Sequence, residues 1–465
     1  MKFEVTVGNV RTQITRYEHF DDLDWFEDFL SVEDEASKFV QVAGRVKHIG
    51  KGKPIRLFCY NTQSFPTGLL RHVLRHAKSD GIEIDMIDKR ERLITTQHTL
   101  DWLRPMQKKA VEIAVRKMNG ILWMPTGSGK TEVAIAISEK LQGKWLFLVH
   151  KKDLLHQTAE RYERRTNKQA SKIGDGVFDV SQNFVVATFQ TLSARIKKRD
   201  EDALALLRSI DGIMVDECHT LPANSFWAIA MNCQSAYRFG LSGTPLARSD
   251  KKSIYAISAL GSIIYRIRPQ QLIEAGLLAQ PIIHMPQVFQ ECKRPTWQGV
   301  YGEMIVKSTK RNKLIVELAR KAEKPCLVFV KQVNHGKALE KRLNKAGIPS
   351  EFIWGDKNTP ARQSATRRLV HGDTDVLIAS NIFQEGVDIP ELRSLIIATA
   401  GKSAIAAIQR IGRGMRLDKG KTVFHVWDIY DEGNRIAEKW SKSRHRIYER
   451  EGYEVVLEPY SLFEK

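Results

Sequence analysis

The stretch that most constrains how this chain folds is residues 125–131, Pro-Thr-Gly-Ser-Gly-Lys-Thr. It follows the apolar run Ile121–Met124 and precedes a segment whose apolar residues recur with helical spacing. A strand, a glycine turn ending in Gly-Lys-Thr and a helix together predict a phosphate-binding loop. Glycines let several backbone N–H groups point inward, and the helix N-terminus adds partial positive charge. The alternative is a glycine turn in which Gly-Lys-Thr occurs by chance.

The residue types of this loop assign a role to each position. The backbone of Thr126, Gly127, Ser128 and Gly129 would surround the phosphates. Lys130 would reach the β- and γ-phosphates of a nucleoside triphosphate, and the Thr131 hydroxyl would ligate Mg²⁺. Met124 stands where the strict pattern has a glycine, six residues before Lys130.

A second apolar run, residues 213–215, ends in the two carboxylates Asp216 and Glu217. Asp216 would hold Mg²⁺ directly or through water, and Glu217 would polarise the attacking water. Two adjacent acids at the end of a strand carry little information alone. Downstream of a phosphate-binding loop, they predict hydrolysis of the nucleotide.

The net charge is +19, and it is unevenly distributed. Residues 1–98 carry 15 basic and 15 acidic side chains, whereas residues 99–280 carry 26 against 17 and residues 281–465 carry 32 against 22. An excess confined to the nucleotide-binding part favours a polyanionic partner, most simply nucleic acid. The alternative is an enzyme that is basic without binding a polyanion.

Strand and helix patterns alternate along two consecutive segments, so we expect an α/β fold. Residues 99–280 and 281–465 each predict a doubly wound parallel sheet, preceded at residues 1–98 by a small α+β accessory domain. Basic residues of the accessory segment could face DNA or could equally form a solvated helix face; they are Arg71, Arg75, Lys78, Arg90 and Arg92. No apolar run approaches the roughly 20 residues of a membrane helix. The scattered cysteines and the start of the chain are typical of a cytoplasmic protein.

The residues Asp-Glu-Cys-His at 216–219 resemble the DExH box of superfamily 2 helicases and translocases, whose phosphate-binding loops tolerate a residue such as Met124. The resemblance implies two tandem RecA-like domains and ATP as the nucleotide, with Gln107 reading the adenine edge. Ser242 and Thr244 lie in the segment Leu-Ser-Gly-Thr-Pro, which resembles motif III and by that likeness links the ATP state to nucleic-acid grip. His219 would couple the DExH box to this motif.

In the second α/β segment, two further motifs follow in the family's order. Ser380 and Asp388 lie in a segment resembling motif V, which implies that Ser380 faces the nucleic-acid backbone and Asp388 the ribose or metal site. Gln409, Arg413 and Arg416 lie in a segment resembling the arginine-finger motif. Their spacing puts all three on one helical face.

Four further positions resemble the family's nucleic-acid contacts, which hold phosphates without reading bases. They are Lys151, Thr188, Gln190 and Lys331. Basic clusters elsewhere could extend this track or could be solvated helix faces.

The segments at 65–70 and 428–453 resemble compact phage and bacterial helicases of the UvsW type. This likeness implies an ATP-dependent DNA helicase, acting with Mg²⁺ on branched or forked DNA in a bacterial or phage-infected cell, beside recombination or replication proteins. Three alternatives remain: an RNA helicase, the motor subunit of a restriction enzyme, and a protein-remodelling ATPase that does not translocate.

Overall fold

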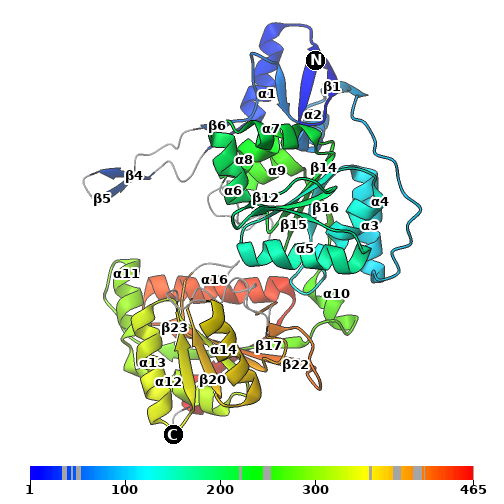
Figure 1. Ribbon diagram of the computed structural model, residues 1–465. Helices are drawn as coiled ribbons and strands as arrows, with labels where there is room; N and C mark the ends of the chain where they lie inside the picture. The colour runs from blue at the N-terminus through cyan, green and yellow to red at the C-terminus, as the bar shows by residue number, and fades with distance from the viewer. Residues whose placement is uncertain are drawn as a thin grey trace. The chain divides into compact units, whose positions relative to one another are not determined.

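The computed structural model describes most of the chain, namely residues 1–33, 39–42, 45–48, 54–218, 223–243, 253–354, 359–380, 389–401, 411–412 and 414–463. The chain divides into two compact units, one of residues 1–124 and 129–267 and one of residues 125–128 and 268–465 (Figure 1). None of the helices in the described ranges is long and apolar enough to cross a membrane.

The centre of the first unit is an eight-stranded sheet with strand order β12-β11-β13-β10-β14-β15-β9-β16. Its strands are β9 (Asn119–Trp123), β10 (Trp145–Val149), β11 (Ser171–Gly174), β12 (Val177–Phe178), β13 (Phe184–Thr188), β14 (Gly212–Asp216), β15 (Tyr237–Ser242) and β16 (Ile263–Arg266). All neighbours pair in parallel except β11 with β12. The inner strands are short, continuous apolar runs because helices cover both faces of the sheet.

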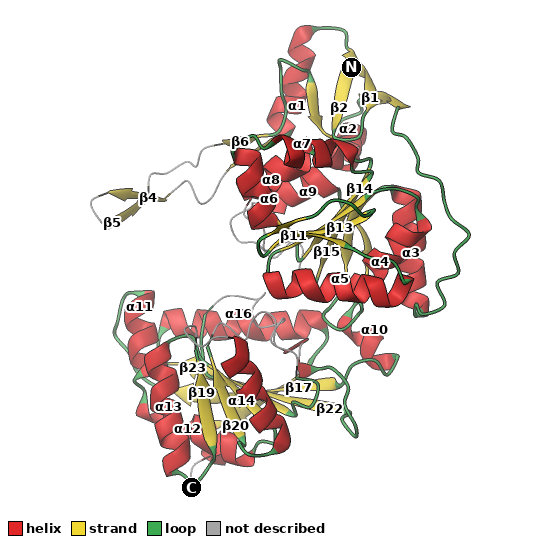
Figure 2. Cartoon of the chain, in the orientation of Figure 1, coloured by secondary structure: helices red, strands yellow, loops and turns green. Residues whose placement is uncertain are grey.

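Helices α3 and α4 lie on one side of this sheet and α8 and α9 on the other (Figure 2). The helices of the unit are α3 (Pro105–Lys117), α4 (Lys130–Lys140), α5 (Lys152–Thr166), α6 (Phe189–Lys197), α7 (Glu201–Ser209), α8 (Ala223–Asn232) and α9 (Ser253–Leu260). Alternating strands and helices with this strand order form a doubly wound fold, as the sequence predicts.

The first 98 residues form their own four-stranded sheet, order β7-β2-β1-β8, within the same unit. Its elements include β1 (Lys2–Val7), β2 (Arg11–Arg16), α1 (Asp24–Phe29), β7 (Ser64–Pro66), the 3-10 turn η3 (Thr67–Leu69), α2 (Leu70–Ser79) and β8 (Glu83–Asp88). Two further antiparallel pairs join β3 (Ser31–Glu33) to β6 (Pro54–Arg56) and β4 (Phe39–Val42) to β5 (Arg45–His48). The mixed sheet and its helices agree with the predicted α+β architecture.

The accessory segment packs directly on the neighbouring α/β body. Its core, built around Phe3, Phe26 and Phe65, extends to Trp227 of α8 and Ile257 of α9. Gly68 permits the closest approach, because a Cβ at this position would collide with backbone carbonyl oxygens of α9. Asn9 also donates a hydrogen bond of 2.8 Å to the carbonyl of Gln234.

The second unit contains another parallel sheet, with order β19-β20-β18-β21-β22-β17-β23 and β24 paired to β17. Its strands are β17 (Gln280–Phe289), β18 (Cys326–Phe329), β19 (Ser350–Ile353), β20 (Val376–Ala379), β21 (Ser394–Ile397), β22 (Val423–Asp428), β23 (Tyr430–Glu432) and β24 (Glu454–Pro459). Its helices include α10 (Pro269–Glu274), α11 (Trp297–Val300), α12 (Thr309–Lys321), α13 (Val333–Lys345), α14 (Thr359–His371) and α16 (Arg435–Glu451). This second doubly wound sheet is also the one predicted.

Two buried ion pairs fasten the carboxyl-terminal helix and α12 to this second sheet. Arg444 of α16 contacts Asp428 at 2.7 Å, and the Tyr448 hydroxyl donates to the same carboxylate at 2.6 Å. Arg311 of α12 contacts Asp431 at 2.9 Å and donates to the Ala398 carbonyl. Because buried charges are costly unless paired, these contacts fix helix positions specifically.

Candidate nucleotide site and nucleic-acid contacts

Three strand ends of the first sheet meet at one edge. In the pairing register Asp216 lies opposite Leu241, and Ser242 lies opposite Trp123. The segment after β9 is the predicted phosphate-binding loop, so the loop, the acidic pair and Ser242 all follow from adjacent parallel strands. The carboxyl edge of such a sheet is where ligands bind in doubly wound folds.

The loop has the backbone shape that its sequence predicts. Gly127 and Gly129 have φ values of 83° and 80°, a region that suits glycine. The buried Ser128 hydroxyl donates to the Pro125 carbonyl at 2.6 Å, and the Ser128 N–H donates to the same oxygen at 3.2 Å. Helix α4 begins at Lys130 immediately after Gly129, so Lys130 and Thr131 occupy its first turn. Thr126 is half-buried in this loop.

Lys130 and Glu217 form the central contact of this edge. The Lys130 Nζ lies 3.1 Å from Glu217 Oε1, and both side chains are largely covered, with 12% and 22% exposed. The Ser242 hydroxyl lies 3.5 Å from Glu217 Oε2, at the outer limit of a hydrogen bond. The structure therefore brings together the loop lysine, the acidic pair and Ser242, the serine expected to link the ATP state to nucleic-acid grip.

In the acidic pair, Glu217 has an unusual backbone conformation and Asp216 has a raised pKa. Glu217 has φ 44°, a left-handed conformation that non-glycine residues rarely adopt and that tends to occur at functional sites. Asp216 Oδ1 accepts a 3.0 Å hydrogen bond from the Glu217 N–H. Burial, and then the nearby Glu217 charge, raise the pKa of Asp216 to about 6. A positive charge beside Asp216 would therefore stabilise its carboxylate form.

Gln107 is buried beside the same loop, and the structure adds a role that the sequence did not predict. Its Oε1 accepts a 2.8 Å hydrogen bond from the Arg104 N–H, which caps the first turn of α3. A Cβ at Gly129 would collide with the Gln107 amide nitrogen, so the loop glycine and this glutamine are in close contact. The sequence signal for the cap is the spacing Arg-Pro-x-Gln at 104–107.

The expected nucleic-acid contacts of the first sheet share an edge. Val149 at the end of β10 pairs with Thr188 at the end of β13, which brings Lys151 close to the start of α6. Gln190 donates a 2.8 Å hydrogen bond to the His150 carbonyl, joining the two segments. Thr188 is buried, and its hydroxyl donates to Thr191 at 2.8 Å. In this structure the Thr188 side chain therefore connects the end of β13 to the first turn of α6.

In the second unit, Lys331 and Ser380 follow the neighbouring strands β18 and β20. The Lys331 ammonium lies 4.9 Å from the ring centre of Trp297 and 5.6 Å from that of Tyr301. This cation–π contact was not predicted, because the rings lie in a segment distant in sequence. Ser380 is buried, and its N–H donates to the Ile353 carbonyl at 3.2 Å.

Of the expected arginine-finger segment, the structure describes Arg416, which pairs with Leu278 in an isolated bridge. Five further residues expected at the site lie outside the described residues, namely His219, Thr244, Asp388, Gln409 and Arg413.

Comparison with known proteins identifies the class. Residues 101–247 match the family model described as type III restriction enzyme, res subunit, and residues 309–418 match the helicase conserved C-terminal domain. A fragment of an HsdR subunit of a type I restriction enzyme from Vibrio vulnificus shares the fold, with a TM-score of 0.58 and 19% identity over 97% of this chain and 85% of that one. The two family matches assign the chain to the superfamily 2 helicases, a class of ATP-hydrolysing enzymes.

Within that class, the chain resembles UvsW, the ATP-dependent DNA helicase of phage T4. The two are 27% identical over 448 residues, which cover 87% of this chain and 86% of UvsW. A protein of the Sulfolobus islandicus filamentous virus, named as helicase 22, is 26% identical over 67% of this chain. The match spans 60% of the length of that viral relative.

Proposed function

We propose that the chain couples ATP hydrolysis to movement along DNA and remodels branched DNA. The observation that carries the proposal is the 3.1 Å contact of Lys130 with Glu217, beside Asp216 and at the end of the phosphate-binding loop. These residues supply a phosphate-binding cation and a general base at one sheet edge. In this account Lys130 binds the β- and γ-phosphates, and Glu217 accepts a proton from the attacking water.

The residues beside Lys130 suit Mg²⁺. Thr131 and Asp216 offer a hydroxyl and a carboxylate, oxygen donors that this ion prefers. The raised pKa of Asp216 supports the proposal, since a cation would offset both its burial and the Glu217 charge. When bound, the ion would neutralise charge on the phosphates. Gln107 would hold the adenine, and Arg413 and Arg416 would act on the γ-phosphate.

Binding to DNA is supported by two protein segments, expected to contact nucleic acid, that lie at the same edge of the first sheet. Lys151 and Gln190 follow adjacent strand ends, where they would hold backbone phosphates without reading bases. Lys331 and Ser380 would do the same in the second unit. We further propose that residues 1–98 form an accessory domain, followed by RecA-like domains at 99–280 and 281–465, and that the protein acts inside a bacterial or phage-infected cell.

A four-way DNA junction with homologous arms tests the remodelling step. We expect the protein to convert labelled junctions into duplex products with ATP, and to leave them intact with a non-hydrolysable ATP analogue, because each step needs hydrolysis. The products are resolved on a native gel. Intact junctions under conditions where single-stranded DNA stimulates ATP hydrolysis would contradict remodelling and leave translocation alone.

A further inference from the structure

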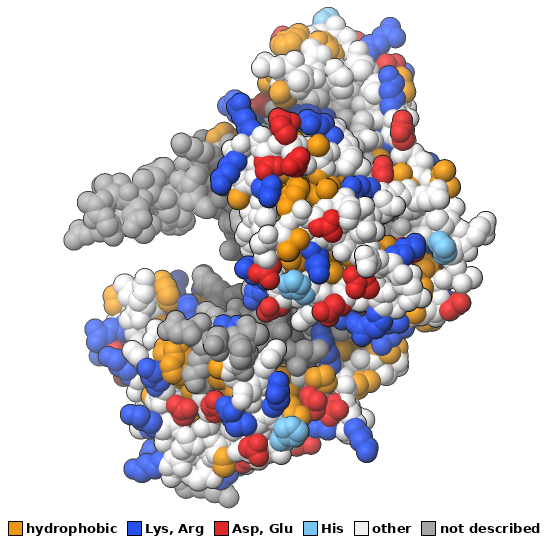
Figure 3. Space-filling model, viewed as in Figure 1, with side chains coloured by type: hydrophobic (Ala, Val, Ile, Leu, Met, Phe, Trp, Pro, Cys, Tyr) orange, Lys and Arg blue, Asp and Glu red, His pale blue; other side chains and the backbone are white. Residues whose placement is uncertain are grey.

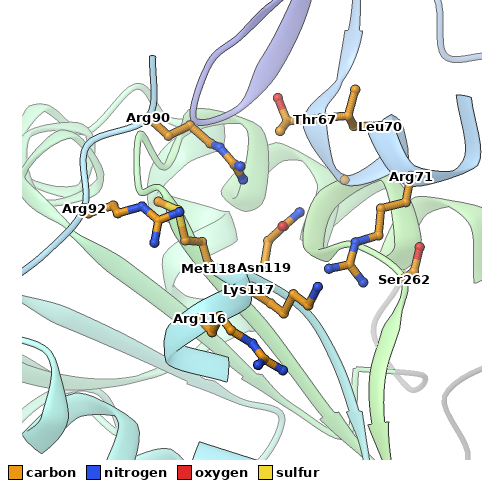
Figure 4. A pocket seen from close by; sticks show the side chains of 11 residues that line it. Thr67, Leu70, Arg71, Arg90, Arg92, Arg116, Lys117, Met118, Asn119 and Ser262 are labelled. Carbon is orange, nitrogen blue, oxygen red and sulfur yellow. The ribbon is translucent and has the colours of Figure 1, made fainter. Parts of the chain in front are cut away.

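A strongly basic cavity of about 180 Å³ lies where the accessory segment meets the first α/β body. Three segments distant in sequence contribute cationic side chains: α2, the chain after β8 and the end of α3 (Figure 4). The cationic residues of its lining are Arg71, Arg90, Arg92, Arg116 and Lys117. Figure 4 shows Arg71, Arg90 and Lys117 directed toward the same space.

The charge of this pocket is poorly compensated by the protein. Arg90 contacts Asp88 at 2.7 Å, and the charge of Arg92 also acts on that carboxylate, but Arg71, Arg116 and Lys117 form no ion pair with the residues that the structure describes. Burial, and then the charge of Arg90, lower the pKa of Arg71. Like charges brought together destabilise a fold unless an anion joins them.

Ordinary helix electrostatics explain only part of this arrangement. Arg116 and Lys117 lie in the last turn of α3, where cations complement the helix dipole. Arg71, however, lies in the first turn of α2, where a cation is unfavourable and no acidic residue is present. Met118, which lines the pocket between Lys117 and β9, has φ 63°, a rare conformation for a bulky side chain. Such strain tends to persist at functional sites.

The chemistry of the lining fits a phosphate group. Arginine grips phosphate with two parallel N–H groups, and Thr67, Asn119 and Ser262 add neutral polar side chains to the wall. The cavity is much larger than the roughly 10–15 Å³ that one water needs. On the face drawn in Figure 3, basic and acidic side chains are interspersed, so no single band of positive charge dominates that view.

The position of the pocket separates it from the phosphate-binding loop. It lies at Asn119, the first residue of β9, whereas the phosphate-binding loop follows Trp123, the last residue of that strand. Four residues of strand separate them by about 13 Å. Lys151 and Gln190 follow the carboxyl ends of parallel strands, so the pocket lies at the opposite edge of the sheet from the expected DNA track.

We propose that this pocket binds a backbone phosphate of a second DNA segment, such as another arm of a branched substrate. The inference rests on the proposed function, since it requires that DNA runs over the carboxyl edge of the first sheet. It specifies where the enzyme distinguishes a junction from a single strand.

The test compares two double variants of the full chain by DNA binding, with labelled single-stranded DNA and a four-way junction at several salt concentrations. The pocket variant is Arg71→Gln with Lys117→Gln. The matched control is Lys78→Gln with Lys109→Gln, which removes one exposed charge from each of the same two helices outside the pocket. Removing residues 1–98 is unsuitable, because it would uncover Trp227 and Ile257.

We expect the pocket variant to bind the junction roughly tenfold more weakly, with a logarithmic salt dependence shallower by about one. Its affinity for single-stranded DNA and the ATPase rate that this DNA stimulates should not change. The control variant should match the unaltered chain on both substrates, and neither variant should unfold at a lower urea concentration than the unaltered chain, because loss of the pocket charges removes repulsion.

Equal junction affinities of the pocket and control variants would overturn the inference. So would a proportional loss of single-strand affinity, which would put the tracked strand in the pocket. A titration heat with inorganic phosphate that the pocket variant lacks, alongside unchanged junction binding, would assign the site to a free anion instead. Failure of the proposed function is separate, because it would appear as an unaltered chain whose ATPase rate does not respond to DNA.

Discussion

Glu217→Gln is expected to lower kcat for ATP hydrolysis by about 10²–10⁴, the usual contribution of a positioned general base. The amide keeps the shape of the carboxylate but cannot accept a proton from water. It also keeps an oxygen that can accept a hydrogen bond from Lys130, which lies 3.1 Å from Glu217 Oε1. ATP binding should therefore persist while turnover falls. Steady-state phosphate release and fluorescent-nucleotide binding measure the two effects separately.

Glu112→Gln provides the matched control for this change. Glu112 is exposed on α3 and is not among the residues expected at the nucleotide site. We expect it to leave kcat unchanged. If Glu217→Gln turned over ATP at the rate of this control, Glu217 could not be the base, and the left-handed backbone at this residue would need another explanation.

Lys130→Ala is expected to lower kcat/KM for ATP by roughly 10²–10³, comparable to the loss of one preorganised group that stabilises charge in a transition state. Unlike the glutamate change, it should also weaken ATP binding, because the ammonium contacts the phosphates in the ground state as well. Affinity for single-stranded DNA, measured by anisotropy without nucleotide, should stay close to that of the unaltered chain.

Lys140→Ala tests whether charge alone explains such a loss. It removes the same charge from the opposite end of α4, ten residues or roughly 15 Å away along the helix. We expect its kcat/KM to be normal. Turnover by Lys130→Ala at the level of Lys140→Ala would contradict the assignment of the loop.

The double variant of Lys130 and Glu217 should lose less kcat/KM than the product of the two single losses, because the two residues act together.

The sequence predicted most of the two large sheets because their strands are short apolar runs separated by helical patterns. The runs Trp145–Val149 and Phe184–Thr188, for example, form β10 and β13. The glycines of the loop and the acidic end of β14 were also readable, since both are local signals. The strands Lys2–Val7 and Arg11–Arg16 were not predicted, because their burial depends on a sheet assembled from distant segments.

The parts of the site that were missed all depend on tertiary contacts. Gln107 caps a helix and touches the loop, and Lys331 lies over the rings of Trp297 and Tyr301. The sequence left Arg71 as either a DNA-facing or a solvated residue, and no local pattern connects it with Lys117. Folding brings both to one pocket, whereas Lys78 of the same helix remains outside it.

If nucleic acid controls ATP hydrolysis at the end of β9, the ATPase rate of the unaltered chain must respond to it. The rate is measured with no nucleic acid and with single-stranded DNA, duplex DNA, a four-way junction or RNA at equal nucleotide and fixed salt concentrations, since phosphate contacts depend steeply on salt. We expect DNA to raise the rate, with the largest increase for the junction and the smallest for RNA. A rate that is the same with and without every nucleic acid would contradict it.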